Sequence, residues 1–350
     1  MYRLFFVLIS LLVGQSFAAD VANLYQSQIP VSSQSEQERQ NVAPEALQQV
    51  ILKVVGDRAK LDTVDISPLL AQTDTLVQQY QYQRINMIND DMTQPDRLEA
   101  VLSFNKVKLN SALSNLGLPI WGHNRPEVII WLALDEGEKR RILSADDSEL
   151  PMVQALQYAA KMRGLPILFP VMDLQDQSKV TYTDLSAGFA ETVEAASQRY
   201  GAPVILLVTA QVSDTGLHRA NWHARINGQS EQWSSRGDTT ITMQAGIDEL
   251  TDRLARRFSQ VETSQFDTIL SLQISDVKNY ADYMRIETYL KNLQNVSSLQ
   301  LTKLQDETLT VNLSFNGEIA VFDRTLAIER VLIEQSLYSA TNVKSYRLSL

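Results

Sequence analysis

Hydrophobic and polar residues are patterned most regularly between residues 200 and 258, where the pattern predicts a buried strand, a hairpin and an amphipathic helix in succession. Residues 203–210 form an apolar run directly after Gly201, which is typical of a strand buried on both faces. Asn227-Gly228 is a turn pair that supplies the two positive φ angles of a two-residue type I′ hairpin. Such a turn would place Trp222 directly opposite Trp233.

The register of this hairpin divides its side chains between two faces. One face would carry both tryptophans together with Ala220, Ala224 and Ile226. The other face would stay in contact with water and carries the polar residues Asn221, His223, Arg225, Ser230, Gln232 and Ser234. The helix predicted at 243–258 has one apolar stripe, formed by Met243, Ile247, Leu250, Leu254 and Phe258. We expect the tryptophan face to cover this stripe.

The whole pattern predicts two or three small α/β and α+β modules with mixed sheets in series. The module at 19–122 would combine strands at 24–31, 81–88 and 97–104 with helices at 35–55, 67–79 and 106–116. The module at 123–262 would place strands at 127–134 and 166–171, and helices at 149–163 and from 184 or 189 to 200, before the hairpin. The module at 263–350 shows the βαββαβ order of a ferredoxin-like unit. Pro44 lies inside the first helix, where we expect a kink or a restart.

Residues 1–18 predict a secretion signal. Arg3 precedes an apolar run at 4–13, and Ser16-Phe17-Ala18 fits a small-x-small cleavage site. The run is shorter than the roughly 20 residues that a transmembrane helix needs, so we expect cleavage after Ala18 and no later spanning segment; an uncleaved anchor is the alternative. The chain has no cysteine, and a secreted protein without disulfides suits a bacterial periplasm better than a eukaryotic exterior.

The net charge of −10 argues against nucleic acid as a partner. Binding to phosphates needs clustered lysine and arginine, and the sequence shows no basic stripe. We therefore expect neither a nucleic-acid partner nor adsorption to anionic lipid.

Several stretches, in this order, resemble the proteobacterial domain-of-unknown-function 2066 family. They are Leu24-Tyr-Gln-Ser-Gln-Ile-Pro-Val31, Val54-Val-Gly-Asp-Arg58, Trp121-Gly-His-Asn-Arg-Pro126 with Trp131, and Ala202-Pro-Val-Ile-Leu-Leu207 with the tryptophan hairpin. The resemblance covers most of the mature chain and implies a secreted protein of unassigned role. The middle module also resembles, more loosely, a periplasmic module found in the N-terminal domain of the Tol–Pal propeller protein, in curli pore proteins and in outer-membrane activators of peptidoglycan synthases. That resemblance implies partner binding and no catalysis.

No motif in the sequence predicts an active site or a cofactor. The sequence has no nucleophile elbow, Walker A loop or dinucleotide fingerprint. His218 and His223 are five residues apart and would point to opposite faces of a strand, and His123 lies in a linker at 118–126. The acidic pairs Asp90-Asp91 and Asp146-Asp147, and the stretch from Asp173 to Asp176, lack the further ligands of a calcium loop, so we interpret the pairs as a solvated turn and a helix N-cap.

The sequence therefore predicts a non-enzymatic periplasmic protein, an adaptor or assembly factor of the cell envelope with a protein partner. A glycan or peptidoglycan binder is the first alternative, because the Trp222/Trp233 pair could stack on a sugar and the last module resembles small peptidoglycan-binding modules in its order of elements. We interpret the tryptophans as core and Asn227-Gly228 as structural, which leaves His223 and Arg225 as the candidate binding residues. An enzyme that uses dispersed carboxylates is the second alternative.

Overall fold

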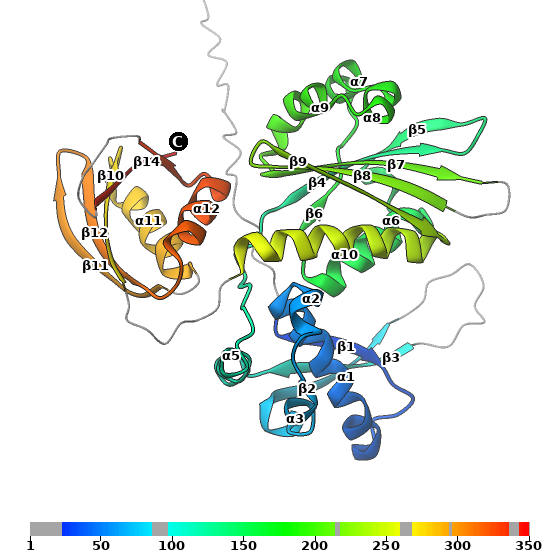
Figure 1. The fold of residues 1–350 in the computed structure, drawn as a ribbon, viewed down its shortest axis with the longest axis horizontal. Helices are drawn as coiled ribbons and strands as arrows, with labels where there is room; N and C mark the ends of the chain where they lie inside the picture. Colours follow the sequence, from blue (N-terminus) through cyan, green and yellow to red (C-terminus); the bar gives the residue numbers. More distant parts are fainter. Residues whose placement is uncertain are drawn as a thin grey trace, which may run out of the picture.

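The computed structural model describes residues 23–85, 97–213, 218–259, 268–293, 296–335 and 343–349 and contains three sheets in series along the chain (Figure 1). The predicted class, small mixed α/β and α+β modules, is confirmed. The predicted signal at 1–18 and the pair Asp90-Asp91 lie outside the described residues. Among the described residues, no helix is both long and apolar enough to cross a membrane.

The first module is a three-stranded antiparallel sheet, in the order β1-β3-β2, with a long helix packed against it. Ser35 accepts a hydrogen bond from the backbone N–H of Glu38 and so caps that helix. The elements are β1 (Gln26–Pro30), α1 (Glu36–Val55), α2 (Arg58–Leu61), α3 (Ser67–Leu70), α4 (Thr73–Leu76), β2 (Val77–Ile85), β3 (Arg97–Phe104) and α5 (Lys106–Asn115).

One of the two alternatives for Pro44, a restart of the helix, and one predicted helix of this module differ from the structure. Helix α1 continues through Pro44 as one element and does not restart there, because the carbonyl that loses its N–H partner belongs to the exposed Gln40 and can bond to water. The helix predicted at 67–79 is replaced by the single turns α3 and α4. The hydroxyl of Thr73 donates to the Leu70 carbonyl at 2.6 Å, and from Val77 onward the backbone pairs with β3.

The middle module is a mixed sheet in the order β5-β4-β7-β8-β9, with helices on both faces (Figure 1). Helices α6 and α10 pack on one face, and α8 and α9 pack on the other. Strands β4 and β7 are parallel and β7, β8 and β9 are antiparallel. The elements are β4 (Val128–Asp135), β5 (Arg140–Leu143), α6 (Pro151–Arg163), β6 (Ile167–Leu168), α7 (Leu174–Lys179), α8 (Tyr182–Ala187), α9 (Ala190–Ser197), β7 (Val204–Val212), β8 (His218–Ile226), β9 (Gln229–Gly237) and α10 (Thr239–Phe258).

The sequence overestimated one strand of this module and missed two elements. The strand predicted at 166–171 pairs with β4 only over Ile167–Leu168, because β5 occupies the same edge of β4 further along. Strand β5 and helix α7 were not predicted, and the helix expected up to residue 200 is divided into α8, α9 and a short 3₁₀ turn at Gln198–Tyr200.

The last module contains all the elements of the predicted βαββαβ unit and one further strand. Its sheet has the order β11-β12-β10-β14-β13. The extra strand β13 reverses the chain after α12, so that β14 runs parallel to β10. The elements are β10 (Thr268–Ser275), α11 (Tyr280–Asn292), β11 (Val296–Gln305), β12 (Thr308–Phe315), α12 (Ile319–Glu329), β13 (Leu332–Glu334) and β14 (Val343–Leu348).

Two buried carboxylates of α10 connect the middle module to the first one. Asp248 and Asp252 accept hydrogen bonds from Arg163, at 2.7 and 2.6 Å, and from Arg58 of the first module, at 2.9 Å each. Arg163 is 2% exposed and also donates to the carbonyl of Gly56 at the end of α1. Each buried charge therefore has a partner of opposite sign, as a buried ion pair requires.

Arg125, which lies in the segment between the two modules, is fully buried and donates to backbone carbonyls. Its guanidinium also lies 4.2 Å from the ring centroid of Trp121. Burial, with a smaller contribution from the nearby Arg163, lowers the pKa of Arg125 from its ordinary value. The carbonyls at the ends of α1 and α6 are among its acceptors, so one side chain caps two helices; the full set is Lys53, Trp121, Gly122, Arg163 and Gly164.

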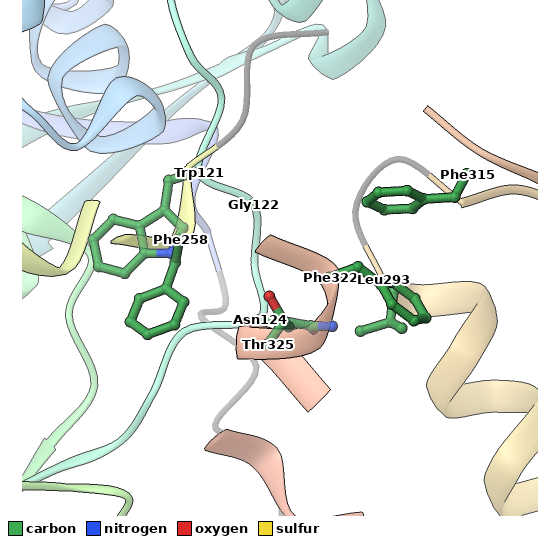
Figure 2. Close-up of a pocket in the computed structure, with 8 residues that line it drawn as sticks. All are labelled: Trp121, Gly122, Asn124, Phe258, Leu293, Phe315, Phe322 and Thr325. Atoms are coloured by element: carbon green, nitrogen blue, oxygen red, sulfur yellow. The ribbon is translucent and has the colours of Figure 1, made fainter. Parts of the chain in front are cut away.

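The last module meets the middle one at the C-terminal end of α10. Figure 2 shows Trp121 and Phe258 on one side of a small cavity and Phe315, Phe322 and Leu293 on the other. The cavity has a volume of about 30 Å³, which holds at most about two water molecules. Polar contacts at this junction include a hydrogen bond from Arg324 to the carbonyl of Arg257 at 3.1 Å.

Candidate functional site

The β8–β9 hairpin has the predicted register. Ile226 pairs with Gln229 and Trp222 pairs with Trp233. Asn227 and Gly228 have φ angles of 50° and 76°, which are the positive values that a type I′ turn requires. The hairpin follows from local sequence, because the turn pair and the alternation of its strands agree with each other.

Trp222 belongs to the core, as the sequence predicted. It is 1% exposed, packs with the α10 stripe and donates from its indole N–H to the Ser235 hydroxyl at 2.8 Å. The helix leaves room for the ring only because residue 246 is glycine, since a Cβ there would lie 1.9 Å from Cζ2 of Trp222. Gly246 is therefore a structural residue that sequence reasoning missed, and a glycine inside the apolar face of a helix was the available signal.

Trp233 is only half-buried, in contrast to Trp222. Its ring is stacked on that of Trp222 with the centroids 6.2 Å apart, and Arg253 of α10 lies 5.1 Å from its ring centroid. Arg253 and Arg257 both pair with Glu231 of β9. The ring of Trp233 is thus partly exposed at the surface and makes a cation–π contact with Arg253.

His223 and Arg225 share the face opposite the tryptophans, as predicted, but this face is less open to water than expected. Both side chains are half-buried, and Arg225 pairs with Glu194 of α9 at 3.0 Å. Burial, with a smaller contribution from Arg225, lowers the pKa of His223. Helix α9 covers this end of the sheet, so the two predicted binding residues are partly occupied by the protein's own packing.

The open edge of β9 is the candidate functional site of the middle module. Strand β9 is the last strand of its sheet, spans nine residues and pairs with β8 without a register shift. The pair that flanks the turn, Ile226 and Gln229, is a hydrogen-bonded pair, and hydrogen-bonded and non-hydrogen-bonded pairs alternate from there along the ladder. The residues of β9 in non-hydrogen-bonded pairs therefore direct their backbone N–H and C=O groups away from β8; they are Ser230, Gln232, Ser234 and Arg236. None of these groups bonds to another backbone group among the described residues.

This edge carries two charged residues, Glu231 and Arg236, but none of three other features that commonly protect an edge strand. Natural sheets blunt exposed edges with charged side chains, proline, bulges or very short strands. The sequence Gln229–Gly237 contains no proline or lysine, and no bulge interrupts it. By contrast, the edge strand β11 of the last module carries Lys303 and two register shifts. A nine-residue edge without proline or a bulge is able to accept an added strand.

A surface hollow lies beside the open edge of β9. Its volume is about 510 Å³. Trp233 lines one side and the first half of α10 lines another, where Ile241 is 56% exposed. The charged residues in the wall are Arg58, Asp248, Glu249 and Arg253, and all of them form ion pairs within the protein. Because every charge in this wall is paired within the protein, the hollow is suited to uncharged side chains more than to a charged ligand.

The other residues considered from the sequence have structural contacts. His218 lies 2.8 Å from the Thr239 hydroxyl, and His123 lies 2.7 Å from the Lys106 amine. The N-cap interpretation of Asp146-Asp147 is wrong, because Ser144 caps this 3₁₀ turn and Asp147 is the third residue of the turn, whose carboxylate completes the capping box. Asp173 caps α7 and pairs with Arg199. The described residues contain no group of three or more histidine, aspartate or glutamate side chains arranged to hold a metal ion.

Comparison with known proteins assigns no function to this surface. Residues 18–122 match the model of a family described as a domain of unknown function (DUF8605), which covers the first module and not the hairpin. No curated protein matches the chain. Among solved structures, the competence or damage-inducible protein from Enterobacter asburiae aligns with 43% of this chain and 93% of its own, at 15% identity and a TM-score of 0.21. A likeness at that TM-score carries no argument about fold or function.

Proposed function

We propose that this chain is a non-enzymatic adaptor or assembly factor of the bacterial cell envelope, located in the periplasm, that binds an extended segment of a partner protein on the edge of β9. The observation that carries the proposal is the regular nine-residue edge, free of proline and bulges, with its outward backbone groups. An added strand would form main-chain hydrogen bonds with these groups, which is a common mode of peptide recognition. The membership in the domain-of-unknown-function 2066 family that the sequence suggests is part of the same proposal.

The hollow beside β9 supports the side-chain part of this recognition. Successive side chains of an added strand point to opposite faces of the sheet. Those on the Trp233 side would lie over Ile241 and Ala245 of α10, which together with Trp233 are the apolar residues of a hollow whose other lining residues are polar or carry paired charges. We therefore propose a partner segment with apolar residues at alternate positions.

Two substitutions at Gln232 test the proposal while they leave the core unchanged. Gln232→Pro removes one outward N–H, and proline is tolerated on an edge strand where its missing N–H faces solvent. Gln232→Ala changes the same side chain but keeps the N–H. A photo-crosslinking residue at Ser234, introduced in cells of the organism that encodes the chain, should form an adduct with another polypeptide in the parent and in the alanine variant. The adduct should be lost in the proline variant.

Several outcomes would contradict this proposal. A crosslinked product made of two copies of this chain would assign the edge to self-association. An adduct that survives Gln232→Pro, in a variant whose melting temperature is unchanged, would mean that the partner does not use the backbone of β9. Recovery of the chain in the cytoplasm after cell fractionation would refute the envelope location.

A glycan or peptidoglycan binder is the second candidate, and one feature of the last module favours it. The sheet face opposite α11 and α12 carries uncharged polar residues in adjacent cross-strand positions, namely Ser271, Gln273, Thr310, Asn312 and Ser314. Hydroxyl and amide groups of this kind pair well with sugar hydroxyls. Retention of the full chain on purified sacculi, unchanged by Gln232→Pro, would favour this function over the adaptor.

A further inference from the structure

A row of charged and polar residues crosses four strands of the middle sheet at the ends of β4 and β7. Asp135 of β4 pairs with Gln211 of β7, Gln211 pairs with Arg219 of β8, and Arg219 pairs with Arg236 of β9. Residues paired in this way share one face of the sheet. The row lies where the two parallel strands end at their carboxyl termini, which is the usual place for a ligand in an open α/β sheet.

The two arginines of this row are placed unfavourably for a protein without a ligand. Arg219 and Arg236 lie directly opposite each other, and the alternation counted from the turn makes them a non-hydrogen-bonded pair, in which side chains approach more closely. Like charges in directly opposite positions destabilise a sheet. Neither arginine has a hydrogen-bond or ion-pair partner among the described residues, although Arg140, at the other end of the row, pairs with Asp135 at 3.3 Å.

A hollow of about 810 Å³ lies against the row, and both arginines line it. This volume falls within the range of small-molecule sites, which is about 300–1,000 Å³. His218 also lines the hollow, but its side chain belongs to the tryptophan face of β8, where its Nε2 lies 2.8 Å from the Thr239 hydroxyl, so it takes no part in the site. The carboxylate of Asp135 is occupied by Arg140, by the Tyr182 hydroxyl at 3.3 Å and by the Gly137 N–H at 2.9 Å, so its charge is compensated within the protein.

We propose that Arg219 and Arg236 form a binding site for an oxyanion, a carboxylate or phosphate group of a small molecule. Two guanidinium groups present several N–H donors in planar forks that match the oxygens of such a group. The bound anion would replace the repulsion between the arginines by two charge-assisted contacts. The side chains of this site lie on the face of the hairpin opposite the tryptophans, so the site does not depend on strand addition to the edge of β9.

The test uses the purified full chain, at low ionic strength, with inorganic phosphate and malonate as separate probes in calorimetric titrations. At least one probe should bind saturably with one anion per chain. Arg219→Gln combined with Arg236→Gln should weaken that binding by at least about tenfold, because charge-assisted hydrogen bonds are lost. Arg347→Gln is the matched control, since Arg347 is an exposed strand arginine of the last module without an ion pair among the described residues, and it should leave the affinity within about twofold.

A melting experiment gives a second readout. Without added anion at low salt, Arg236→Gln should raise the melting temperature because it removes one of two opposed like charges. Phosphate or malonate should raise the melting temperature of the parent but not of the double variant. Tighter binding of phosphate or of malonate identifies the class of oxyanion, and either supports the site. Absence of saturable binding of both anions, or equal binding by parent and double variant, would overturn the proposal.

Discussion

Gly246 and Trp222 show that one missing methyl group decides how α10 lies on its sheet. Glycine inside a helix normally weakens it by about 1 kcal/mol relative to alanine. Here it is required, because a Cβ at position 246 would lie within 2.4 Å of three atoms of the Trp222 ring. The glycine therefore lowers the intrinsic stability of the helix, but it allows the indole ring of Trp222 to be fully buried.

The first prediction concerns this pair. Gly246→Ala should destabilise the protein by about 1–3 kcal/mol through overpacking, and Trp222→Ala should cost about 3–5 kcal/mol through the cavity that it leaves. In the Trp222→Ala background the same Gly246→Ala change should become neutral or stabilising by up to about 1 kcal/mol, because the clash is gone and helix propensity remains. Urea unfolding of the four proteins measures the cycle.

Gln244→Ala, on the exposed side of the same helix, is the control and should change the free energy of unfolding by less than about 0.5 kcal/mol. If Gly246→Ala destabilises equally with and without Trp222, the ring is not what the new methyl group meets.

A second prediction at the residue scale concerns Lys53, which is buried at the C-terminal end of α1. Burial, with smaller contributions from Lys161 and Arg125, lowers the pKa of Lys53 to about 8 from 10.5. Below pH 8 the amine is protonated in the folded and the unfolded chain, so the folded state bears the full free-energy cost of burying a charged amine. Between pH 8 and 10.5 the unfolded chain keeps a proton that the folded chain has lost, and folding stability rises with pH.

The advantage of Lys53→Met over the parent in unfolding free energy should therefore be larger at pH 7 than at pH 10.5. The difference in unfolding free energy between variant and parent should shrink by on the order of 3 kcal/mol over that interval, at ~1.4 kcal/mol per unit of pKa shift. Groups common to both proteins cancel in this comparison. A difference that stays constant with pH would show that Lys53 keeps an ordinary pKa in the folded state.

At the scale of elements, the sequence predicted what neighbouring residues determine. The turn Asn227-Gly228, the register of β8 and β9 and the stripe of α10 are local patterns, and the structure contains all three. Strand β3 begins and ends where the alternation of apolar residues does. These elements need no information from distant parts of the chain.

Elements that depend on distant partners were predicted poorly. Strands β5 and β13 are four and three residues long and exist because β4 and β14 offer them an edge. Helix α9 covers Arg225, and β9 lies at an open edge, because of the order of the strands in the sheet. Hydrophobic periodicity along the sequence does not reveal that order. For the same reason the sequence did not predict that Arg219 and Arg236 lie opposite each other in one row across the sheet. His223 and Arg225 as binding residues remain a prediction.

At the scale of the whole molecule, buried charges join the first two modules, while a small contact of apolar side chains and a few hydrogen bonds joins the third. Arg58 and Arg163 share Asp248 and Asp252 across the boundary between the first and middle modules. The third module meets them through the few side chains around a 30 Å³ cavity. The first two modules should therefore unfold together, and the last module separately.

Tryptophan fluorescence separates these events. The four tryptophans of the chain, at positions 121, 131, 222 and 233, all precede the last module. Because Trp121 lines the junction with the last module, the test uses a Trp121→Phe background. Fluorescence of the other three tryptophans in a urea titration should then report one transition, and far-UV circular dichroism should report that transition and one more. Arg163→Met should shift only the shared transition, by about 3–5 kcal/mol, because two carboxylates stay buried with fewer partners. Coincident transitions for both probes would show that the three modules unfold as one unit.

The ion pairs between Arg58 and α10 cannot form until both parts of the chain have been synthesised. Arg58 and Asp252 are separated by 194 positions along the chain. At a translation rate of about 5–20 residues per second, this separation corresponds to roughly 10–40 s. During that time the first module has been made but the helix that completes its charged surface has not. The interface with the middle module is thus among the last features of these two modules to form, and the surface around Arg58 is exposed to other proteins until it does.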